Sequence, residues 1–163
     1  LLYNPVGSDS DSGSPELIIN PANHDDTVGE VVSASRDELE SALDSAKPWL
    51  SSSAVERSAT LRSAAEHLES SSGELFAMLC RESGKTISDA VAELREAVDF
   101  LRYYANQCEG YEGAPPRGII CCISPWNFPL AIFVGPVAAA LAAGNAVIAK
   151  PSELTPLIAF RAT

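Results

Sequence analysis

The sequence predicts an α/β fold in which short strands and four helices lead into one β-α-β unit with parallel strands. Two observations carry this prediction. Apolar residues recur at alternating spacings of three and four between Ile87 and Ala105, the period of a long amphipathic helix. Further on, the apolar runs GIICCI (118–123) and NAVIAK (145–150) flank an alanine-rich segment. Uniformly apolar strands are typical of a parallel sheet covered on both faces.

The first part of the chain is irregular and then strand-like. Residues 1–15 are rich in Ser, Asp, Gly and Pro, which predicts an irregular lead-in. The β-branched runs at residues 16–20 and 27–34 predict two short strands, and the turn-rich sequence PANHDD separates them.

Three helices are predicted next. Ser35 and Ser53 are each followed three residues later by a glutamate, which is the capping-box pattern of a helix start. We expect the first helix to end at Pro48 and a third helix, 73–83, to stop at Gly84. The residues predicted to face the core are Leu39, Ala42, Leu43 and Ala46 in the first helix, and Leu61, Ala64, Ala65 and Leu68 in the second.

The fourth helix has the strongest pattern, and the β-α-β unit follows it. Its predicted inward seam consists of Ile87, Val91, Leu94, Val98, Leu101 and Ala105. After a loop, we expect a strand at 118–123, a helix from near Pro136 to Gly144, a strand at 145–150, and a turn at Pro151.

Charge and composition bound the function classes. The net charge is −11, and all but one of the 22 acidic residues precede Pro115. Such an acidic surface repels nucleic acid. The longest apolar run, 130–144, is too short for a membrane span and is interrupted by glycine and proline. With no basic-then-apolar leader at the start, we expect a soluble, cytoplasmic protein.

Several motifs favour structural readings. RESGKT (81–86) resembles the end of a phosphate-binding loop, but Leu79 stands where that loop needs glycine. Glu93 and Glu96 share one face of a polar helix, a spacing that usually means solvation. The four cysteines have no metal-ligand spacing, so we expect no metal and reduced thiols in or near the core: Cys80, Cys108, Cys121 and Cys122.

The ends of the two parallel strands predict a site. Both carboxyl ends lie at one edge of the sheet, where α/β proteins bind ligands, so Trp126 and Asn127 should face the same crevice as Lys150 and Glu153. The Asn127 amide, held between prolines, suits oxyanion stabilisation. Lys150 can donate to sugar hydroxyls and Glu153 can accept from them. A structural reading is equally open, in which Trp126 packs on a helix, Asn127 satisfies turn backbone and Lys150 caps a strand.

These residues resemble a known family. ISPWNFPLAIF (123–133) and AAALAAGNAVIAKPSELTPL (138–157) are similar to the aldehyde dehydrogenase superfamily, whose members share P-[WF]-N-[FY]-P and a later K-P-[SA]-E. RESGKTISDAVAELREAVDFLRYYA (81–105) resembles the corresponding long helix, and the resemblance covers about residues 16–163. REAVDFLRYYA and KPSELTPLIA most resemble the L-glutamate γ-semialdehyde dehydrogenase module of the bifunctional proline utilization A enzymes.

The resemblance implies a fold and an activity. Residues 16–115 would be the N-terminal helical part of an NAD-binding domain, and 116–163 the first β-α-β of its Rossmann-like core. The activity would be NAD-dependent oxidation of L-glutamate γ-semialdehyde to L-glutamate in proline catabolism. A cysteine thiolate attacks the aldehyde, the oxyanion passes hydride to NAD, and a glutamate assists hydrolysis. The roles carried over are Asn127 for the oxyanion, Phe128 and Glu96 for substrate, and Ile123, Ser124, Pro125, Trp126, Lys150, Ser152 and Glu153 for NAD.

The family pattern also has parts that the chain lacks. In the family, the nucleophilic cysteine, the general-base glutamate and the glycine-rich cofactor loop follow the K-P-x-E segment, whereas this chain ends at Thr163. We therefore expect an N-terminal fragment, inactive alone, whose partners are the rest of the domain, an aldehyde substrate and further copies of itself. FAD is expected only if a proline dehydrogenase domain precedes Leu1. The alternatives are another aldehyde dehydrogenase, such as a succinate-semialdehyde type, or a non-catalytic paralogue acting in binding or assembly.

Overall fold

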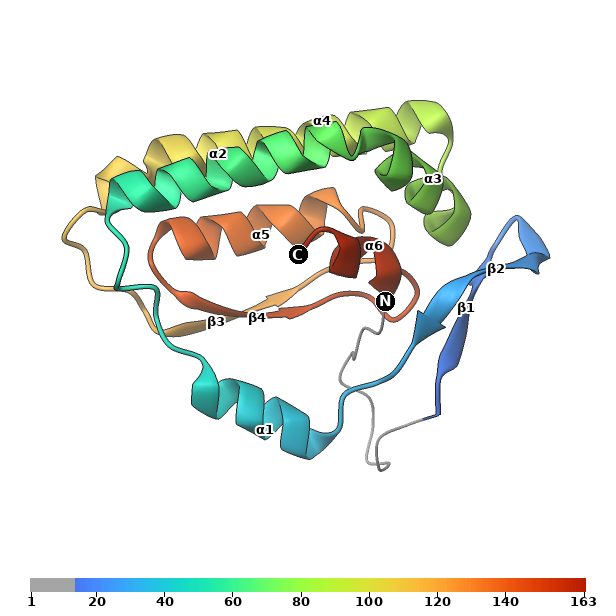
Figure 1. Ribbon diagram of the computed structural model, residues 1–163, viewed down its shortest axis with the longest axis horizontal. Helices are drawn as coiled ribbons and strands as arrows, with labels where there is room; N and C mark the ends of the chain where they lie inside the picture. The colour runs from blue at the N-terminus through green and yellow to red at the C-terminus, as the bar shows by residue number, and fades with distance from the viewer. Residues whose placement is uncertain (1–13) are drawn as a thin grey trace.

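The computed structural model describes residues 14–163, so residues 1–13 of the predicted lead-in lie outside the described part. In Figure 1, α2 and α4 lie side by side above α5, α5 lies on the β3–β4 pair, and α1 lies beyond these strands. The elements in chain order are β1 (Glu16–Asn20), β2 (Asn23–Val31), α1 (Arg36–Ser45), α2 (Ala54–Ser70), α3 (Ser72–Ser83), α4 (Ile87–Gln107), the 3-10 helix η1 (Cys108–Tyr111), β3 (Ile119–Ile123), α5 (Ala131–Ala142), β4 (Ala146–Lys150) and α6 (Pro156–Arg161).

One hydrophobic cluster joins α2, α3, α4, η1, α5 and α6 to each other. It takes residues from both predicted parts of the chain, 16–115 and 116–163, and the boundary between them stays a prediction. The predicted seam of α4 is buried at its four later positions, Leu94, Val98, Leu101 and Ala105. Ile87 and Val91 are exposed, contrary to the prediction. At this end the helix buries Ala90 and Glu93 instead, so its buried face is rotated away from Ile87 and Val91.

The capping boxes predicted two helix starts correctly. Ser35 and Ser53 each accept a hydrogen bond from the backbone N–H of the glutamate three residues on, and the side chain of that glutamate accepts one from the serine backbone N–H. In α2 the predicted residues Leu61, Ala65 and Leu68 are buried. The predicted inward face of α1 is wrong, because no residue of α1 is buried. The helix lies on the side of β3 and β4 away from the helical core, so within residues 14–163 that core does not cover it (Figure 1).

The first two strands form an antiparallel hairpin. Glu16 pairs with Val31, and the turn between the strands is only two residues long. Strand β2 begins at Asn23, earlier than the predicted residue 27, and ends at Val31. Its polar first residues pair on an exposed edge, where no alternation of apolar residues is needed.

The second strand pair is parallel, as predicted. Ile119 is opposite Ala146 and Ile123 is opposite Lys150. Burial on both faces is not observed within residues 14–163, because α5 covers only one face, and Ile119, Cys121 and Ile123 are exposed. The expectation of four core or near-core thiols is therefore wrong for Cys121, although all four cysteines are free thiols.

Helix α5 begins earlier than predicted, and Pro136 lies inside it. A proline in a helix interior lacks the N–H that would bond to the carbonyl four residues before it. That carbonyl belongs to Ile132, and it accepts a hydrogen bond from Ser124 Oγ at 3.3 Å. The proline is tolerated because a side chain from the preceding turn replaces the missing donor. After β4 comes α6, a short helix that the sequence did not predict.

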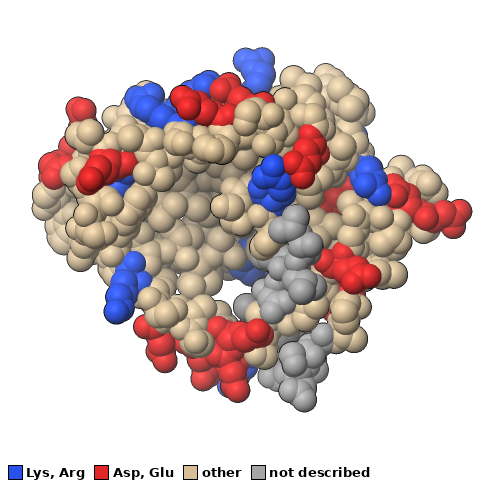
Figure 2. All heavy atoms as spheres, viewed as in Figure 1, with Lys and Arg blue, Asp and Glu red and all other residues tan. Residues whose placement is uncertain are grey.

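Charged side chains lie around the rim of the view in Figure 2. Acidic side chains gather over α1, whose sequence RDELESALDS carries four of them, and charged residues of both signs lie along α2 and α4. The surface between them, over α5 and the strands, is nearly uncharged (Figure 2). None of the helices described between residues 14 and 163 has the length and apolarity needed to cross a membrane.

Candidate active-site edge

The candidate site is the carboxyl edge of the β3–β4 pair. Ile123 and Lys150 are the last paired residues, and Ser124 N donates to Lys150 O at 3.0 Å, which extends the pairing by one residue. The segments that leave these strands, 124–128 and 151–153, therefore begin side by side. This placement confirms the expectation that the two motifs share one edge of the sheet.

The turn between β3 and α5 is anchored at both ends. Ser124 is buried and bonds to the Ile132 carbonyl, and Pro129 and Leu130 are fully buried at the other end. Between these anchors the chain presents Trp126, Asn127 and Phe128 to solvent.

The structural reading of these side chains does not match what is observed. Trp126 is 54% exposed and so is not packed into a helix face, and Pro125 beside it is half-buried. Within residues 14–163, the Asn127 amide makes no hydrogen bond. Ile123, at the end of the strand, is 71% exposed. The edge thus exposes the apolar side chains of Ile123 and Trp126, and an Asn127 amide that has no hydrogen-bond partner within residues 14–163.

Lys150 and Glu153 form a loose pair on the neighbouring segment. Lys150 Nζ lies 3.4 Å from Glu153 Oε2, and the Glu153 side chain is largely exposed. A backbone N–H bond at Glu153 itself, then the bond and charge of Lys150, hold the pKa of the Glu153 carboxyl below its ordinary value. Ser152 is buried, and its Oγ accepts from Leu154 N at 3.2 Å, so its hydroxyl is engaged in the turn.

Glu96 lines a different hollow, which none of the strand-end residues lines. It is exposed on α4 and lines this shallow hollow with Arg95, Phe100 and Tyr103. Its neighbour Glu93 is buried instead, and the interpretation of Glu93 as a solvated residue is wrong. Its helical position falls in one stripe with Ala90 and Ala97, so the buried face of α4 carries it inward.

Three charged residues were missed by sequence reasoning. Lys85 Nζ lies 2.8 Å from Glu93 Oε2 and 4.5 Å from the centroid of the Phe128 ring. Glu82, on α3, accepts hydrogen bonds from the backbone at the start of α6. The spacing of Glu93 from Ala90 and Ala97 could have predicted its burial. Glu82 and Lys85 belong to the RESGKT motif, which was considered as the end of a phosphate-binding loop.

The cysteines of the chain do not supply a nucleophile at this edge. Burial raises the pKa of the Cys108 and Cys122 thiols, which disfavours the thiolate that nucleophilic attack requires. Cys121, although exposed, lies inside β3 and two residues before its end.

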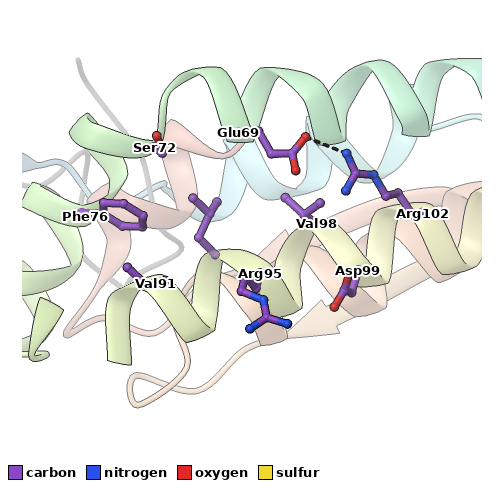
Figure 3. A pocket seen from close by; sticks show the side chains of 9 residues that line it. Glu69, Ser72, Phe76, Val91, Arg95, Val98, Asp99 and Arg102 are labelled. Atoms are coloured by element: carbon purple, nitrogen blue, oxygen red, sulfur yellow. Dashed lines mark hydrogen bonds and ion pairs between the residues drawn. The ribbon is translucent and has the colours of Figure 1, made fainter. Parts of the chain in front are cut away.

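A separate hollow lies between α4 and the ends of α2 and α3 (Figure 3). Phe76 and Val91 line it, and Arg102 on its rim forms an ion pair with Glu69 at 2.6 Å. None of the predicted site residues lines this hollow. It is therefore distinct from the strand-end edge.

Comparison with known proteins identifies the family. The model of the aldehyde dehydrogenase family matches residues 8–163. This chain belongs to the aldehyde dehydrogenase family. The predicted family resemblance and the α/β fold class are thus confirmed.

The named relatives agree with the narrower resemblance. The chain is 51% identical to the bifunctional protein PutA of Escherichia coli (strain K12) over 98% of its own length and 12% of that protein. It is 37% identical to 1-pyrroline-5-carboxylate dehydrogenase 2 of Bacillus subtilis (strain 168), covering 88% of this chain and 32% of that protein. The chain therefore spans well under half of the length of these curated relatives.

Solved structures show the same fold. A 1-pyrroline-5-carboxylate dehydrogenase from Thermus with bound NAD superposes with a TM-score of 0.87 at 32% identity, over 99% of this chain and 36% of that one. Proline utilization A from Bdellovibrio bacteriovorus, inactivated by N-propargylglycine, gives a TM-score of 0.88 at 31% identity, over 99% of this chain and 19% of that one.

Proposed function

We propose that this chain provides the cofactor-facing edge and the oxyanion-stabilising amide of an NAD-dependent dehydrogenase. Its reaction would be the oxidation of L-glutamate γ-semialdehyde to L-glutamate in proline catabolism. The observation that carries the proposal is the exposed Asn127 amide at the tip of a turn anchored on both sides, beside Lys150 and Glu153. The names of the relatives support the substrate, because 1-pyrroline-5-carboxylate is the cyclic form of this semialdehyde.

The edge fits NAD chemically. A bound nicotinamide would accept the hydride that leaves the aldehyde carbon. Lys150 can donate to a ribose hydroxyl and Glu153 can accept from one, because their mutual contact is long, at 3.4 Å, and both can turn toward a ligand. Ile123 and Trp126 offer exposed apolar surface to the flat parts of the cofactor. The remaining proposed contacts are Ser124, Pro125 and Ser152.

Asn127 is the residue we propose to act on the reacting oxygen. Its side-chain N–H₂ donates a hydrogen bond where negative charge develops, and a donor that is already oriented stabilises the transition state most. Phe128, the next residue, is proposed to form a wall of the aldehyde pocket. Glu96, which is exposed on α4, is proposed to meet the ammonium end of the substrate.

Further partners are proposed at the level of the full-length gene product. These partners are the remaining parts of the dehydrogenase domain and further copies of the chain in a homo-oligomer. We also propose a cytoplasmic location. FAD is proposed only for a full-length protein that also carries a proline dehydrogenase domain.

The test is a comparison of aldehydes with the full-length protein and NAD, followed by NADH absorbance. We expect kcat/KM for glutamate semialdehyde to exceed that for succinate semialdehyde by roughly a hundredfold, the discrimination a polar site achieves when it pairs with a substrate group. A preference for succinate semialdehyde would favour another aldehyde dehydrogenase. No NADH from either aldehyde would favour the non-catalytic alternative.

A further inference from the structure

We propose that Lys85 and Glu93 are positioning residues for the Asn127 turn. The buried pair fixes the start of α5 and the Phe128 ring, and through them the direction of the Asn127 amide. This inference rests on the proposed function, because it assigns the two residues to the same reaction. Neither residue touches the substrate or the cofactor in this account.

Glu93 holds the start of α5 from a neighbouring helix. Its Oε1 accepts hydrogen bonds from Leu130 N at 2.7 Å and from Ala131 N at 3.2 Å. These N–H groups belong to the first turn of α5, where a helix has no internal acceptors and its dipole favours a negative charge. The Glu93 side chain is only 1% exposed, so this carboxylate is committed to the backbone of the turn and is not a surface charge.

Lys85 holds the same turn by a different contact. Its Nζ lies 2.8 Å from Glu93 Oε2, and the same ammonium lies over the Phe128 ring at 4.5 Å from the centroid. A cation at this distance from an aromatic face is attracted by the ring. The Lys85 side chain is 13% exposed, so solvent screens both interactions only weakly.

The local sequence explains why Lys85 points here. Gly84 adopts a left-handed conformation with φ of 67° and closes α3, and Thr86 caps the start of α4. Lys85 thus lies between the ends of two helices, and its side chain reaches Glu93 on α4. The RESGKT motif, which resembles the end of a phosphate-binding loop, instead supplies the lysine of a buried ion pair in this structure.

Together these contacts hold the residues that directly follow Asn127 in the chain. Phe128 directly follows Asn127, and Leu130 is the third residue after Asn127, so both are too close in sequence to move without moving Asn127. On the other side, Ser124 is held by its bonds to Lys150 O and Ile132 O. The Asn127 amide has no internal partner within residues 14–163, so the backbone alone directs it. Misplacing a catalytic group by about 1 Å can lower the rate about a hundredfold.

The experiment compares four variants in the full-length protein. Lys85→Met removes the charge at similar length, Lys85→Arg keeps the charge, and Glu93→Gln weakens the hold on the α5 backbone. Arg102→Met is the matched control, because it breaks an ion pair of exposed side chains with Glu69 on the far edge of α4. Each is measured for kcat, for NAD affinity, and for hydrogen exchange of the Leu130 and Ala131 amides.

We expect Lys85→Met and Glu93→Gln to lower kcat by about tenfold or more while NAD affinity changes by no more than about twofold, because only the amide direction is altered. Exchange at the two amides should rise by about tenfold in Glu93→Gln, since their acceptor is weakened. Lys85→Arg should restore most of the activity. Arg102→Met should change none of these quantities.

Two outcomes would overturn the inference. One is an unchanged kcat in Lys85→Met, and the other is equal loss in kcat and NAD affinity with no rescue by arginine, which a general loss of stability would produce. If Lys85→Met does not fold, the double variant Lys85→Met with Glu93→Met removes both charges at once, and a wild-type kcat in it would refute the role.

Failure of the proposed function would look different. Wild-type protein that forms no NADH with any aldehyde would refute the function, and amide exchange alone would then decide whether the pair holds the turn. Wild-type protein that turns over normally, with equally active Lys85→Met, would refute only the positioning role.

Discussion

Glu82 makes the stability of this fold depend on pH in a defined window. The side chain is 3% exposed, and its two carboxylate oxygens accept from Leu157 N at 2.7 Å and Ile158 N at 2.8 Å. Burial raises the pKa of Glu82 to about 7 from an ordinary value of 4.5, although the two backbone donors act in the opposite direction. The native state therefore holds a proton between these values that the unfolded state has released.

The sign and size of the effect follow from this difference. A native state that binds more protons loses stability as the pH rises, so the stability that Glu82 contributes is fully present below pH 4.5 and is lost as the pH rises to about 7. The gap between the two pKa values corresponds to a loss of roughly 3 kcal/mol. Asp26 acts in a separate window, because the hydrogen bond from Arg81 lowers its pKa to about 2, and the stability it contributes is lost only in more acidic solution.

The assay is urea unfolding of the full-length protein between about pH 5 and pH 8, for wild type and Glu82→Gln. Glutamine does not titrate, so the difference in the free energy of unfolding between the two proteins should change by roughly 3 kcal/mol across this range. Parallel stability curves would show that Glu82 does not bind its proton in the native state, and would refute the reasoning.

Three further perturbations test other parts of the structure. Arg57→Leu should lower the free energy of unfolding by about 3 kcal/mol, because it leaves the buried Ala142 carbonyl without the Nε–H donor that lies 3.1 Å away; urea unfolding measures it. Gly144→Ala should cost about 1 kcal/mol, since Gly144 has φ of 78°, whereas Gly73→Ala, in open space within α3, should cost nothing. Lys150→Met should weaken NAD binding by about tenfold, as the loss of one hydrogen bond to a charged group predicts, and calorimetric titration that shows unchanged affinity would contradict the ribose contact.

Local signals were read correctly from the sequence. The capping boxes at Ser35 and Ser53 depend on residues three apart, so they specify a helix start without help from the rest of the fold. The parallel strand pair followed from two apolar runs joined by a helix-length segment. The same pairing predicts that Asn127 and Lys150 lie at one edge of the sheet, as the structure shows.

Long-range contacts were not readable from the sequence. Glu93 meets the α5 backbone 37 residues away, and Glu82 meets the α6 backbone 75 residues away. The spacing of Glu93 from Ala90 and Ala97 places it on the buried face of α4, but no local pattern indicates the backbone that either carboxylate binds. Helix α5 starts before Pro136 because Ser124, from outside the helix, satisfies the carbonyl that the proline leaves free. The apolar face of α1 is exposed because tertiary packing decides burial, and the described chain places no core beside that helix.

The most direct test of the proposed site is the turnover of Asn127→Ala in the full-length protein with glutamate semialdehyde and NAD. Asn106→Ala is the matched control, because Asn106 is also an exposed asparagine and its side chain bonds only to Arg62 within the described chain. The account predicts that kcat of Asn127→Ala falls by about 10²–10³ with NAD affinity preserved, the cost of losing one oxyanion donor. Turnover within a few-fold of wild type would contradict the role of Asn127 and, with it, the site.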